Sequence, residues 1–416
     1  MRIALAYEYL VRLGGAEKVL KVLSEMFPEA PIFCLFYDET KTGRLFPKQR
    51  IRTSYLQKYY NLSSLLPSLL RRGRGRCEFL PYLLRRGRGR CEFLPSLLRR
   101  GRGRCQWLLP KMPAAMESLD FSGFDLVISV SSAFAHGIIV PQKTKHLCYC
   151  NSPMRYAWDH THEYIKEQGG GFLKKILMSY TLHKVRQWDL ASANRPDLYL
   201  ANSLNVQKRI QKYYRLSSQI VYPPVEIEKL KIKTIPHLSL SLYHFITLSL
   251  NRYFLIVSTL TPYKKIDLAI KTFNRNQLPL VIVGDGPQSM ALQKMAKSNI
   301  IFVGFQPAEN LPYFYQNCRA LIFSGEEDFG LTPVEAMACG KPVLGYRQGG
   351  LLETVIEGKT GEFFDESTST SLQIGLERLI KNEANYNQQQ IRDQAEKFSR
   401  EKFEAKIKKA VDEAMV

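Results

Sequence analysis

Short apolar runs alternate with helix-like patterns along most of this chain of 416 residues. The run RIALAY at 2–7 precedes a stretch at 16–27, AEKVLKVLSEMF, whose apolar residues recur at helical spacing. Further strand-like runs lie at 124–129, 146–150 and 196–202. Apolar strands that alternate with helices are typical of a parallel, doubly wound α/β sheet with both faces covered.

A second series of strands is predicted after QIVYPPV at 219–225, where two prolines break the pattern and suggest a hinge between domains. These apolar runs are again separated by helical segments, and they lie at 252–260, 278–286, 299–305, 318–325 and 341–346. We therefore predict two Rossmann-like domains that face a cleft, followed by a C-terminal helical segment that packs back on the first domain. The predicted boundaries are 1–221, 222–395 and 396–416.

Three near-identical arginine-rich blocks interrupt the first series between about residues 66 and 105. Each block contains RRGRGRC, and Pro67, Pro81 and Pro95 recur every fourteen residues. The prolines and the two glycines of each block prevent a long helix. The pattern of the first domain resumes at 108–129, so we interpret the blocks as a tandem-repeat insertion in a surface connection, where long insertions are tolerated.

Charge is distributed unevenly along the chain, whose net charge is +21. Residues 1–221 hold 36 Lys and Arg against 16 Asp and Glu, whereas residues 222–395 hold 17 of each. A basic half beside a neutral half indicates that one domain faces anions. The N-terminal sequence has no signal-peptide pattern, and the eight cysteines in a chain of this length fit a reducing compartment, so we expect a cytoplasmic protein.

The sequence GEEDFGLTPVEAMACGKPVLGYRQGG, at 325–350, carries the strongest functional signal. Thr332 is placed to cap a helix that has Pro333 at its first position and Gly340 at its end. A helix N-terminus at the carboxyl ends of parallel strands favours phosphate and sugar hydroxyls. The same spacing also matches a capping box, in which Glu335 bonds back to the Thr332 backbone, so spacing alone leaves two roles open for Glu335.

With motifs elsewhere in the chain, this stretch resembles the paired-glutamate motif of family 4 retaining glycosyltransferases, which have the two-domain GT-B fold. The supporting motifs occur in the family's order: GGAEKVL (14–20), CYCNSPMRYAWD (148–159), TPYKKIDLAI (261–270), VIVGDGP (281–287) and EEDFGLTPVEAMACGKPV (326–343). The chain is similar to bacterial mannosyltransferases of O-antigen and exopolysaccharide assembly. The resemblance implies transfer of a sugar, with retention, from a nucleotide donor to a lipid-linked or polysaccharide acceptor.

The resemblance implies roles for the residues of the paired-glutamate motif. Glu327 would lie beside the donor sugar as a catalytic residue. The backbone amides of Phe329, Gly330 and Leu331 would contact sugar hydroxyls and the diphosphate. Glu335 would accept hydrogen bonds from the ribose of the nucleotide.

Other matching positions supply expected phosphate and acceptor contacts. Lys264, with Lys265 as the next choice, would bind the diphosphate, although each lysine also fits a solvated helix start. Gly14 and Gly15 would bring a helix N-terminus close to donor phosphate or acceptor, or make only a tight turn. Arg155 is a candidate for acceptor or phosphate binding, with a structural salt bridge as the alternative.

No metal or separate cofactor is expected. The chain has no Asp-x-Asp pair, and the resemblance implies metal-independent transfer, with GDP-mannose as the suggested donor substrate. The sequence WDHTHEY at 158–164 matches no standard metal-ligand spacing. Retention leaves two routes open: double displacement through carboxylates, or same-face substitution in which the leaving diphosphate helps to deprotonate the acceptor.

Three departures from the family pattern allow an alternative, a weakened or inactive homologue. Thr259 stands where members usually have an arginine, and loss of one cation on a diphosphate costs about 1.5–3 kcal/mol. Asn151, a predicted catalytic residue, stands where a histidine is usual and cannot accept a proton at neutral pH. Glu8 and Tyr9 replace a common aspartate-tryptophan pair.

The expected partners are a nucleotide sugar, a lipid-linked glycan acceptor and an anionic membrane surface at the inner face of the plasma membrane. GFLKKILMSY at 171–180 fits an interfacial helix as well as an ordinary core-facing one. The arginine blocks resemble RNA-binding arginine-glycine segments, which makes a nucleic-acid or membrane-binding protein an alternative. Aromatics are few and no nucleic-acid-binding fold is recognised, so nucleic acid is not the expected partner.

Overall fold

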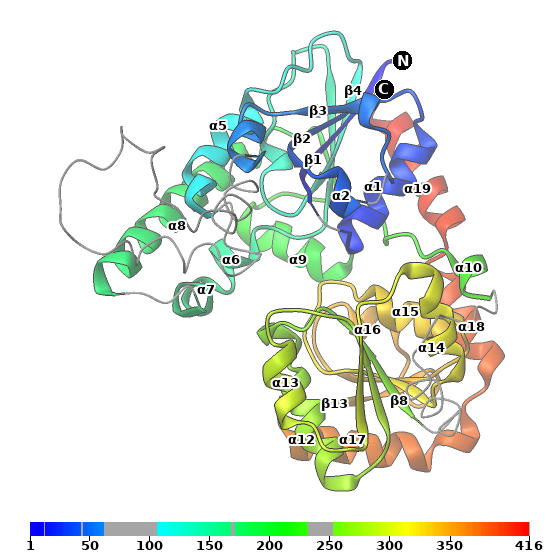
Figure 1. Ribbon diagram of the computed structural model, residues 1–416. Coiled ribbons are helices and arrows are strands. Elements are labelled where there is room, and N and C mark those ends of the chain that lie inside the picture. The colour runs from blue at the N-terminus through cyan, green and yellow to red at the C-terminus, as the bar shows by residue number, and fades with distance from the viewer. Residues whose placement is uncertain (12, 43–44, 62–105, 168–170, 232–252, 416) are drawn as a thin grey trace. The chain divides into compact units, whose positions relative to one another are not determined.

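The computed structural model describes residues 1–11, 13–42, 45–61, 106–167, 171–231 and 253–415 (Figure 1). The expectations for the arginine blocks lie outside these residues. The chain divides into two compact units. Nearly all of the first is Met1–Tyr199 with Tyr213–Leu216, and nearly all of the second is Leu200–Lys212 with Ser217–Ala414.

The first sheet has seven strands in the order β3-β2-β1-β4-β5-β6-β7. Its strands run parallel from β3 through to β5, and β6 runs parallel to β7. The strands are β1 (Ile3–Leu10), β2 (Ile32–Tyr37), β3 (Ile51–Thr53), β4 (Leu126–Ser131), β5 (Lys145–Cys150), β6 (Leu198–Ala201) and β7 (Gln219–Ile220).

Helix α1 follows β1. Its apolar residues fall on one face, and that face packs in the core, where Val19, Leu20 and Leu23 are buried. The α-helices of the first unit are α1 (Gly15–Met26), α2 (Glu39–Thr42), α5 (Met112–Glu117), α6 (Arg155–Trp158), α7 (Thr161–Glu167) and α8 (Phe172–Ser192). Short 3-10 helices lie at Lys48–Arg50, Gln106–Lys111 and Ala135–Gly137. Helix α9 (Leu204–Tyr213) begins in the part assigned to the second unit.

The second sheet has six parallel strands in the order β10-β9-β8-β11-β12-β13. Each strand is four or five residues long and mostly apolar, as expected for a sheet covered on both faces. The strands are β8 (Phe254–Val257), β9 (Leu280–Val283), β10 (Ile300–Gly304), β11 (Ala320–Phe323), β12 (Val343–Tyr346) and β13 (Gly361–Phe364).

Helices cover both faces of this second sheet (Figure 1). Leu255 of β8 packs in the cluster with α10, α14, α15 and α18, whereas its neighbours Phe254 and Ile256 pack with α12, α13 and α17. The helices are α10 (Ile227–Lys231), α12 (Ile266–Asn276), α13 (Ser289–Met295), α14 (Leu311–Asn317), α15 (Leu331–Ala338), α16 (Leu351–Thr354), α17 (Ser369–Lys381), α18 (Gln388–Glu396) and α19 (Arg400–Met415). The 3-10 helices are Pro262–Lys264, Ala308–Asn310 and Glu383–Asn385.

The predicted pair of doubly wound parallel sheets is therefore confirmed. In each sheet the strand order reverses at one central pair, β1 with β4 in the first and β8 with β11 in the second. Ligands of open α/β sheets bind outside the carboxyl ends of the strands at such a reversal. We therefore expect ligand-binding residues at the carboxyl ends of these two central strand pairs.

Candidate functional site

The structure brings Lys264 and Glu327 into direct contact. Lys264 ends the 3-10 helix after β8, Glu327 lies in the loop after β11, and the Lys264 ammonium pairs with Glu327 Oε1. The two side chains are 16% and 25% exposed, so the pair is partly shielded from water while it stays reachable. A shielded cation beside a carboxylate, at the strand reversal of the second sheet, suits an anionic ligand that carries hydroxyl groups.

Two glycine positions allow the backbone around this pair to pack closely. A Cβ at Gly325 would lie 2.8 Å from both Lys264 Cα and the Tyr263 carbonyl oxygen. A Cβ at Gly350 would lie 2.3 Å from the Asp328 carbonyl oxygen, and the Gly350 amide donates to the Glu327 carbonyl at 2.9 Å. Sequence analysis did not assign these glycines a role, because a close backbone approach is visible only in three dimensions.

Helix α15 begins two residues earlier than predicted. Gly330 is its N-cap, with a φ of 87°, and no side chain caps the helix. The prediction that Thr332 is the cap is therefore wrong, and the capping-box role of Glu335 is excluded with it, because Thr332 lies inside the helix. Glycine adopts positive φ without strain, so the chain turns into the helix there. The end of the helix is confirmed, since Gly340 follows it with a φ of 75°.

Glu335 and Phe329, two further residues with predicted roles in this motif, have buried side chains. Glu335 is 5% exposed and accepts a hydrogen bond of 2.7 Å from the Tyr315 hydroxyl. Phe329 is 3% exposed, and its ring packs 5.4 Å from that of Phe398. Phe329 therefore anchors the loop through its side chain, and ligand contacts from the backbone amides of Phe329, Gly330 and Leu331 stay a prediction.

The start of helix α12 supplies a second turn at this edge. Lys265 is the N-cap of α12 and has a φ of 52°, which turns the chain from the 3-10 helix into α12. Thr259 is exposed beside this turn. A Cβ at Gly284 would lie 1.9 Å from the Ser258 carbonyl oxygen, and one at Gly286 would lie 2.4 Å from that of Leu260, so these glycines shape a loop.

Arg209 of helix α9 contacts the same acidic loop and was missed by sequence analysis. Its guanidinium lies 3.3 Å from Glu326 and 3.2 Å from Asp328, with the arginine side chain 12% exposed. Asn205, one turn earlier, donates to Asp328 at 3.1 Å. The loop that carries Glu327 is therefore held by residues more than a hundred positions away in the sequence, a separation that no local pattern reveals.

Gly14 and Gly15 lie at the start of helix α1 in the first unit. Gly14 is the N-cap, with an extended backbone and no side-chain cap. A Cβ at Gly14 would lie 3.0 Å from Glu17 Oε2. Glu17 is buried and accepts a hydrogen bond of 2.7 Å from the Tyr7 hydroxyl. A carboxylate therefore already lies in the first turn of this helix, and the ligand role of Gly14 and Gly15 stays a prediction.

Asn151 and Arg155 follow β5 on the same unit. The Asn151 side-chain amide donates to Ser132 Oγ at 3.3 Å, so the loop after β4 orients it. Arg155 is the first residue of α6, and its guanidinium lies 3.0 Å from His160 Nε2. His160 in turn lies 3.0 Å from Glu163. This chain of contacts supports the structural role weighed for Arg155 at least as much as a ligand role.

Glu8 is fully buried at the carboxyl end of β1. Its Oε1 accepts hydrogen bonds from Ser131 Oγ and from the backbone amides of Ser132, Ala133, Phe134 and Ala135, at 2.8–3.1 Å. Burial raises the pKa of this carboxyl, and the backbone hydrogen bonds work in the opposite direction. The glutamate in place of a common aspartate therefore has a structural function, which is to hold the loop after β4.

The described ranges contain neither a metal centre nor a membrane-spanning helix. No group of three or more His, Cys, Asp or Glu in them is arranged to hold a metal ion. None of the helices described there is both long and apolar enough to cross a bilayer.

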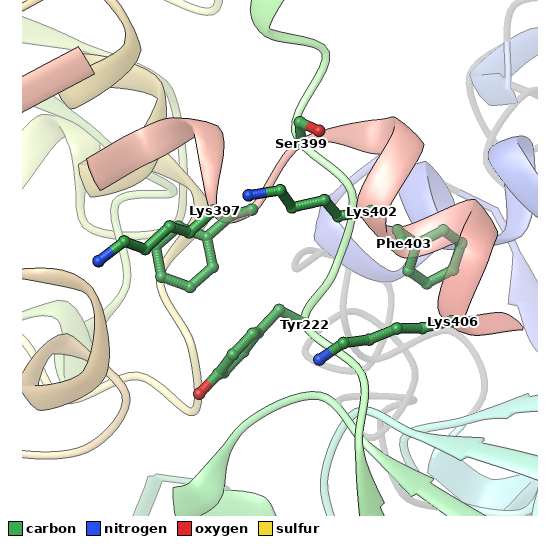
Figure 2. A pocket seen from close by; sticks show the side chains of 7 residues that line it. Tyr222, Lys397, Ser399, Lys402, Phe403 and Lys406 are labelled. Carbon is green, nitrogen blue, oxygen red and sulfur yellow. The ribbon is translucent and has the colours of Figure 1, made fainter. Parts of the chain in front are cut away.

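A small pocket lies between Tyr222 and the last two helices (Figure 2). Its lining includes Lys397 and Lys402, and Lys406 Nζ lies 5.4 Å from the centre of the Tyr222 ring. The predicted site residues do not line this pocket. This pocket lies at the start of α19 and is not the candidate site.

Part of the second unit matches a known family model. Residues 249–398 match the family model described as glycosyl transferases group 1. This range contains Lys264, Glu327 and Glu335, the residues around which the candidate site is built. The family model therefore covers the part of the chain in which the geometry placed that site.

Curated relatives include two mannosyltransferases. The GDP-mannose-dependent alpha-(1-6)-phosphatidylinositol monomannoside mannosyltransferase of Mycolicibacterium smegmatis is 37% identical over 26% of this chain and 33% of its own. The O-antigen chain mannosyltransferase C of Escherichia coli is 25% identical over 46% of this chain and 53% of its own. The chain thus matches only a third to about half of the length of these relatives.

A solved structure with the same fold covers the whole chain. The Anabaena protein Alr3699/HepE in complex with UDP-glucose superposes with a TM-score of 0.65, over 99% of this chain and 100% of the other, at 17% identity. At this identity the similarity establishes the fold. It agrees with the two parallel sheets described above.

Proposed function

Because this chain carries a group 1 glycosyl transferase domain on a GT-B fold, we propose that it transfers a hexose, mannose in the first instance, from a nucleoside diphosphate sugar to a glycan acceptor. The acceptor is a lipid-linked or polysaccharide chain. The transfer retains the anomeric configuration and needs no metal ion. The observation that carries the proposal is the contact between Lys264 and Glu327 at the strand reversal of the second sheet.

We assign different roles in the reaction to Lys264, Glu327 and Glu335. When the sugar-diphosphate bond breaks, negative charge develops on the departing diphosphate, and Lys264 with the N-terminal amides of α15 would stabilise it. Glu327, held by Lys264 before the donor binds, would turn to the sugar hydroxyls when the diphosphate takes its place on the lysine. Glu335, buried against Tyr315, would accept the ribose hydroxyls as the resemblance implies.

The proposed reaction balances without a further reagent. The bond from the anomeric carbon to the phosphate oxygen breaks, and the acceptor hydroxyl forms the new glycosidic bond on the same face. The hydroxyl proton passes to the departing diphosphate, which leaves as the nucleoside diphosphate. Asn151 would position the acceptor through hydrogen bonds, because an amide side chain cannot accept a proton at neutral pH.

The relatives support mannose as the first sugar to test. Two of the relatives described above are mannosyltransferases, whereas the Anabaena structure holds UDP-glucose. The nucleobase is therefore an experimental question. An O-antigen relative supports a lipid-linked acceptor, and the activity of the whole protein is part of the proposal.

The test is a panel of nucleotide sugars, with thermal shift for binding and release of nucleoside diphosphate for turnover. We expect one donor, GDP-mannose first, to raise the melting temperature. Lys264→Met should weaken its binding about tenfold or more, because a charge-assisted contact contributes about 1.5–3 kcal/mol. Lys271→Met is the matched control, since Lys271 is 52% exposed and pairs only at the surface with Asp267 at 3.0 Å.

Catalysis and binding are separated with Glu327→Gln, which should lower turnover about 100-fold or more while donor binding changes less. Proton NMR of the product tests retention, and excess EDTA tests metal independence. No response to any nucleoside diphosphate sugar would refute the proposal. Donor binding without turnover, with Lys264→Met still weakened, would instead favour the alternative of a homologue impaired by Thr259 and Asn151.

A further inference from the structure

The first half of helix α8 exposes a row of large apolar side chains. The exposed fraction is 78% for Phe172, 80% for Leu173, 51% for Ile176, 65% for Leu177 and 58% for Tyr180. We call these five residues the outer face of α8. Isolated exposed apolar residues are common on soluble proteins, but five within nine residues of one helix are a contiguous patch that needs a partner.

Helical geometry places this patch opposite the side of α8 that packs on the protein. Successive residues turn by about 100°, so the five outer-face residues fall within an arc of roughly 140°. Leu182 and Val185 are buried and lie on the opposite side of the helix axis. Helix α8 therefore has two apolar faces, one that joins the core of the first unit and one that the core does not use.

The charges around the outer face are basic. Lys174 and Lys175 flank the apolar arc, one on each side, at about 60° from its edges. Lys184 lies one turn after Tyr180, with its ammonium 5.7 Å from the centre of the tyrosine ring. The one acid in α8, Asp189, is buried. On the neighbouring α7, the Glu163 carboxylate lies 3.0 Å from His160.

We propose that the outer face of α8 docks the protein on an anionic lipid bilayer. The helix would lie in the plane of the interface, with Phe172, Leu173, Ile176 and Leu177 among the upper acyl chains and Lys174 and Lys175 at the headgroups. Tyr180 fits the interface because its ring is apolar and its hydroxyl is polar.

Charge complementarity selects lipid over a protein partner. An apolar helix face bordered on both sides by lysines matches a surface that is apolar inside and negative outside, which is the profile of an anionic leaflet. The sequence before Val221 reinforces this, since its 36 basic residues exceed its 16 acidic ones. The inference does not need the proposed transferase activity, because binding to lipid is measured without a donor.

Flotation with full-length protein tests the proposal, using vesicles of phosphatidylcholine mixed with phosphatidylglycerol and vesicles of phosphatidylcholine alone. We expect the protein to float with the anionic vesicles. The double substitution Leu173→Asn/Leu177→Asn should reduce its partitioning into these vesicles at least about tenfold, because two apolar side chains no longer contribute to binding. Ile374→Asn is the control, since Ile374 is 54% exposed on helix α17 of the second unit and should leave flotation unchanged.

Two further variants locate the source of binding. Lys174→Gln/Lys175→Gln should reduce flotation with anionic vesicles and make the remainder less sensitive to salt. The third test is a deletion of residues 68–95, which removes two arginine blocks. In this deletion, flotation should still be stronger with the wild-type outer face of α8 than with the double asparagine substitution.

Flotation of the double asparagine variant at the wild-type level overturns the proposal. So does loss of all flotation in the deletion, because the arginine blocks would then be the anchor. A dimer in free solution that dissociates on the asparagine substitutions, with flotation unaffected, would also overturn it, because the partner would be a second copy.

Discussion

The Glu8 carboxylate shows how a single buried residue determines the shape of a loop. One of its oxygens accepts four consecutive backbone amides, from Ser132 to Ala135, in a water-free environment. A buried amide that loses its acceptor costs about 1–3 kcal/mol, so this one carboxylate compensates several such penalties. The same loop also orients Asn151, a predicted catalytic residue of the first unit, through Ser132.

We predict that Glu8→Ala lowers the free energy of unfolding by about 3 kcal/mol or more, since the four amides would lose their common acceptor. Glu8→Gln keeps Oε1 and should lose markedly less. Urea denaturation at neutral pH measures both. Equal losses for the two variants would show that the volume of the side chain, and not its acceptor oxygen, stabilises the loop.

The buried His146 is expected to make the stability of the folded protein sensitive to acid. Burial lowers the pKa of His146 from 6.5 to about 3, and its Nε2 lies 2.8 Å from Ser129 Oγ. Between these pKa values the unfolded chain binds a proton that the folded protein does not, so the free energy of unfolding falls as the pH falls from about 6.5 to 3. His136, whose pKa burial lowers to about 4, acts in the same direction. Asp189, whose pKa burial raises to about 7, opposes both.

His146→Gln should remove only the contribution of His146. We expect the free energy of unfolding to change with pH less steeply in this variant, by about 1.4 kcal/mol per pH unit near pH 5. Denaturant melts at several pH values between 4 and 7 measure the slope in both proteins. His136 and Asp189 titrate in both and largely cancel in the difference. Parallel slopes would mean that His146 is protonated in the folded protein.

At the scale of the element, the conformation of Gly330 determines where helix α15 begins. Gly330 takes a φ of 87° there. Gly330→Ala should cost about 1 kcal/mol of stability through strain at positive φ, and should weaken donor binding about tenfold by tilting the amides from Phe329 to Leu331. Gly358→Ala is a matched control, because Gly358 has a φ of 73° and open space around it, away from the site.

Thermal denaturation and calorimetric titration with the donor measure the two effects separately. Both alanine variants should lose similar stability, and only Gly330→Ala should lose affinity. Undiminished affinity in Gly330→Ala would show that the donor does not use this helix start.

The strands that could be predicted from the sequence are those with a continuous apolar run. Runs at 124–129 and 278–286, for example, contain most of β4 and all of β9. Strand β2, IFCLFY, meets the same criterion and was overlooked. Strands β3 and β7 have three and two residues, too few for any periodicity, and only pairing with a neighbouring strand defines them.

The candidate site was predictable as a set of residues but not as a geometry. Topology alone places Lys264 and Glu327 at one edge of the second sheet, since each follows a strand beside the reversal. Their contact, the close approach of Gly325 and the pairing of Arg209 with Glu326 depend on backbone positions that no local sequence pattern encodes. The Thr332 cap was mispredicted for the same reason, because a threonine-proline pair carries no information on the φ of Gly330.

At the scale of the whole molecule, the arginine blocks separate two segments that pack in one core. Leu56 and Tyr60 precede the blocks, Leu108 and Met112 follow them, and all four are buried in the same hydrophobic cluster. The two ends of the connection are therefore fixed by the fold and not by the sequence between them. The length and charge of that sequence can then change while the core stays intact.

We accordingly predict that deletion of residues 68–95 leaves a cooperatively folding protein. The cut joins Pro67 to Ser96 and so keeps one block in frame. About 16 residues remain between the described segments, and these reach roughly 50 Å when extended, which is ample for ends that share a core. Shortening the loop should raise the free energy of unfolding by about 1 kcal/mol. Urea melts and donor binding compare the deletion with the full chain, and loss of soluble or cooperatively unfolding protein would show that the blocks belong to the fold.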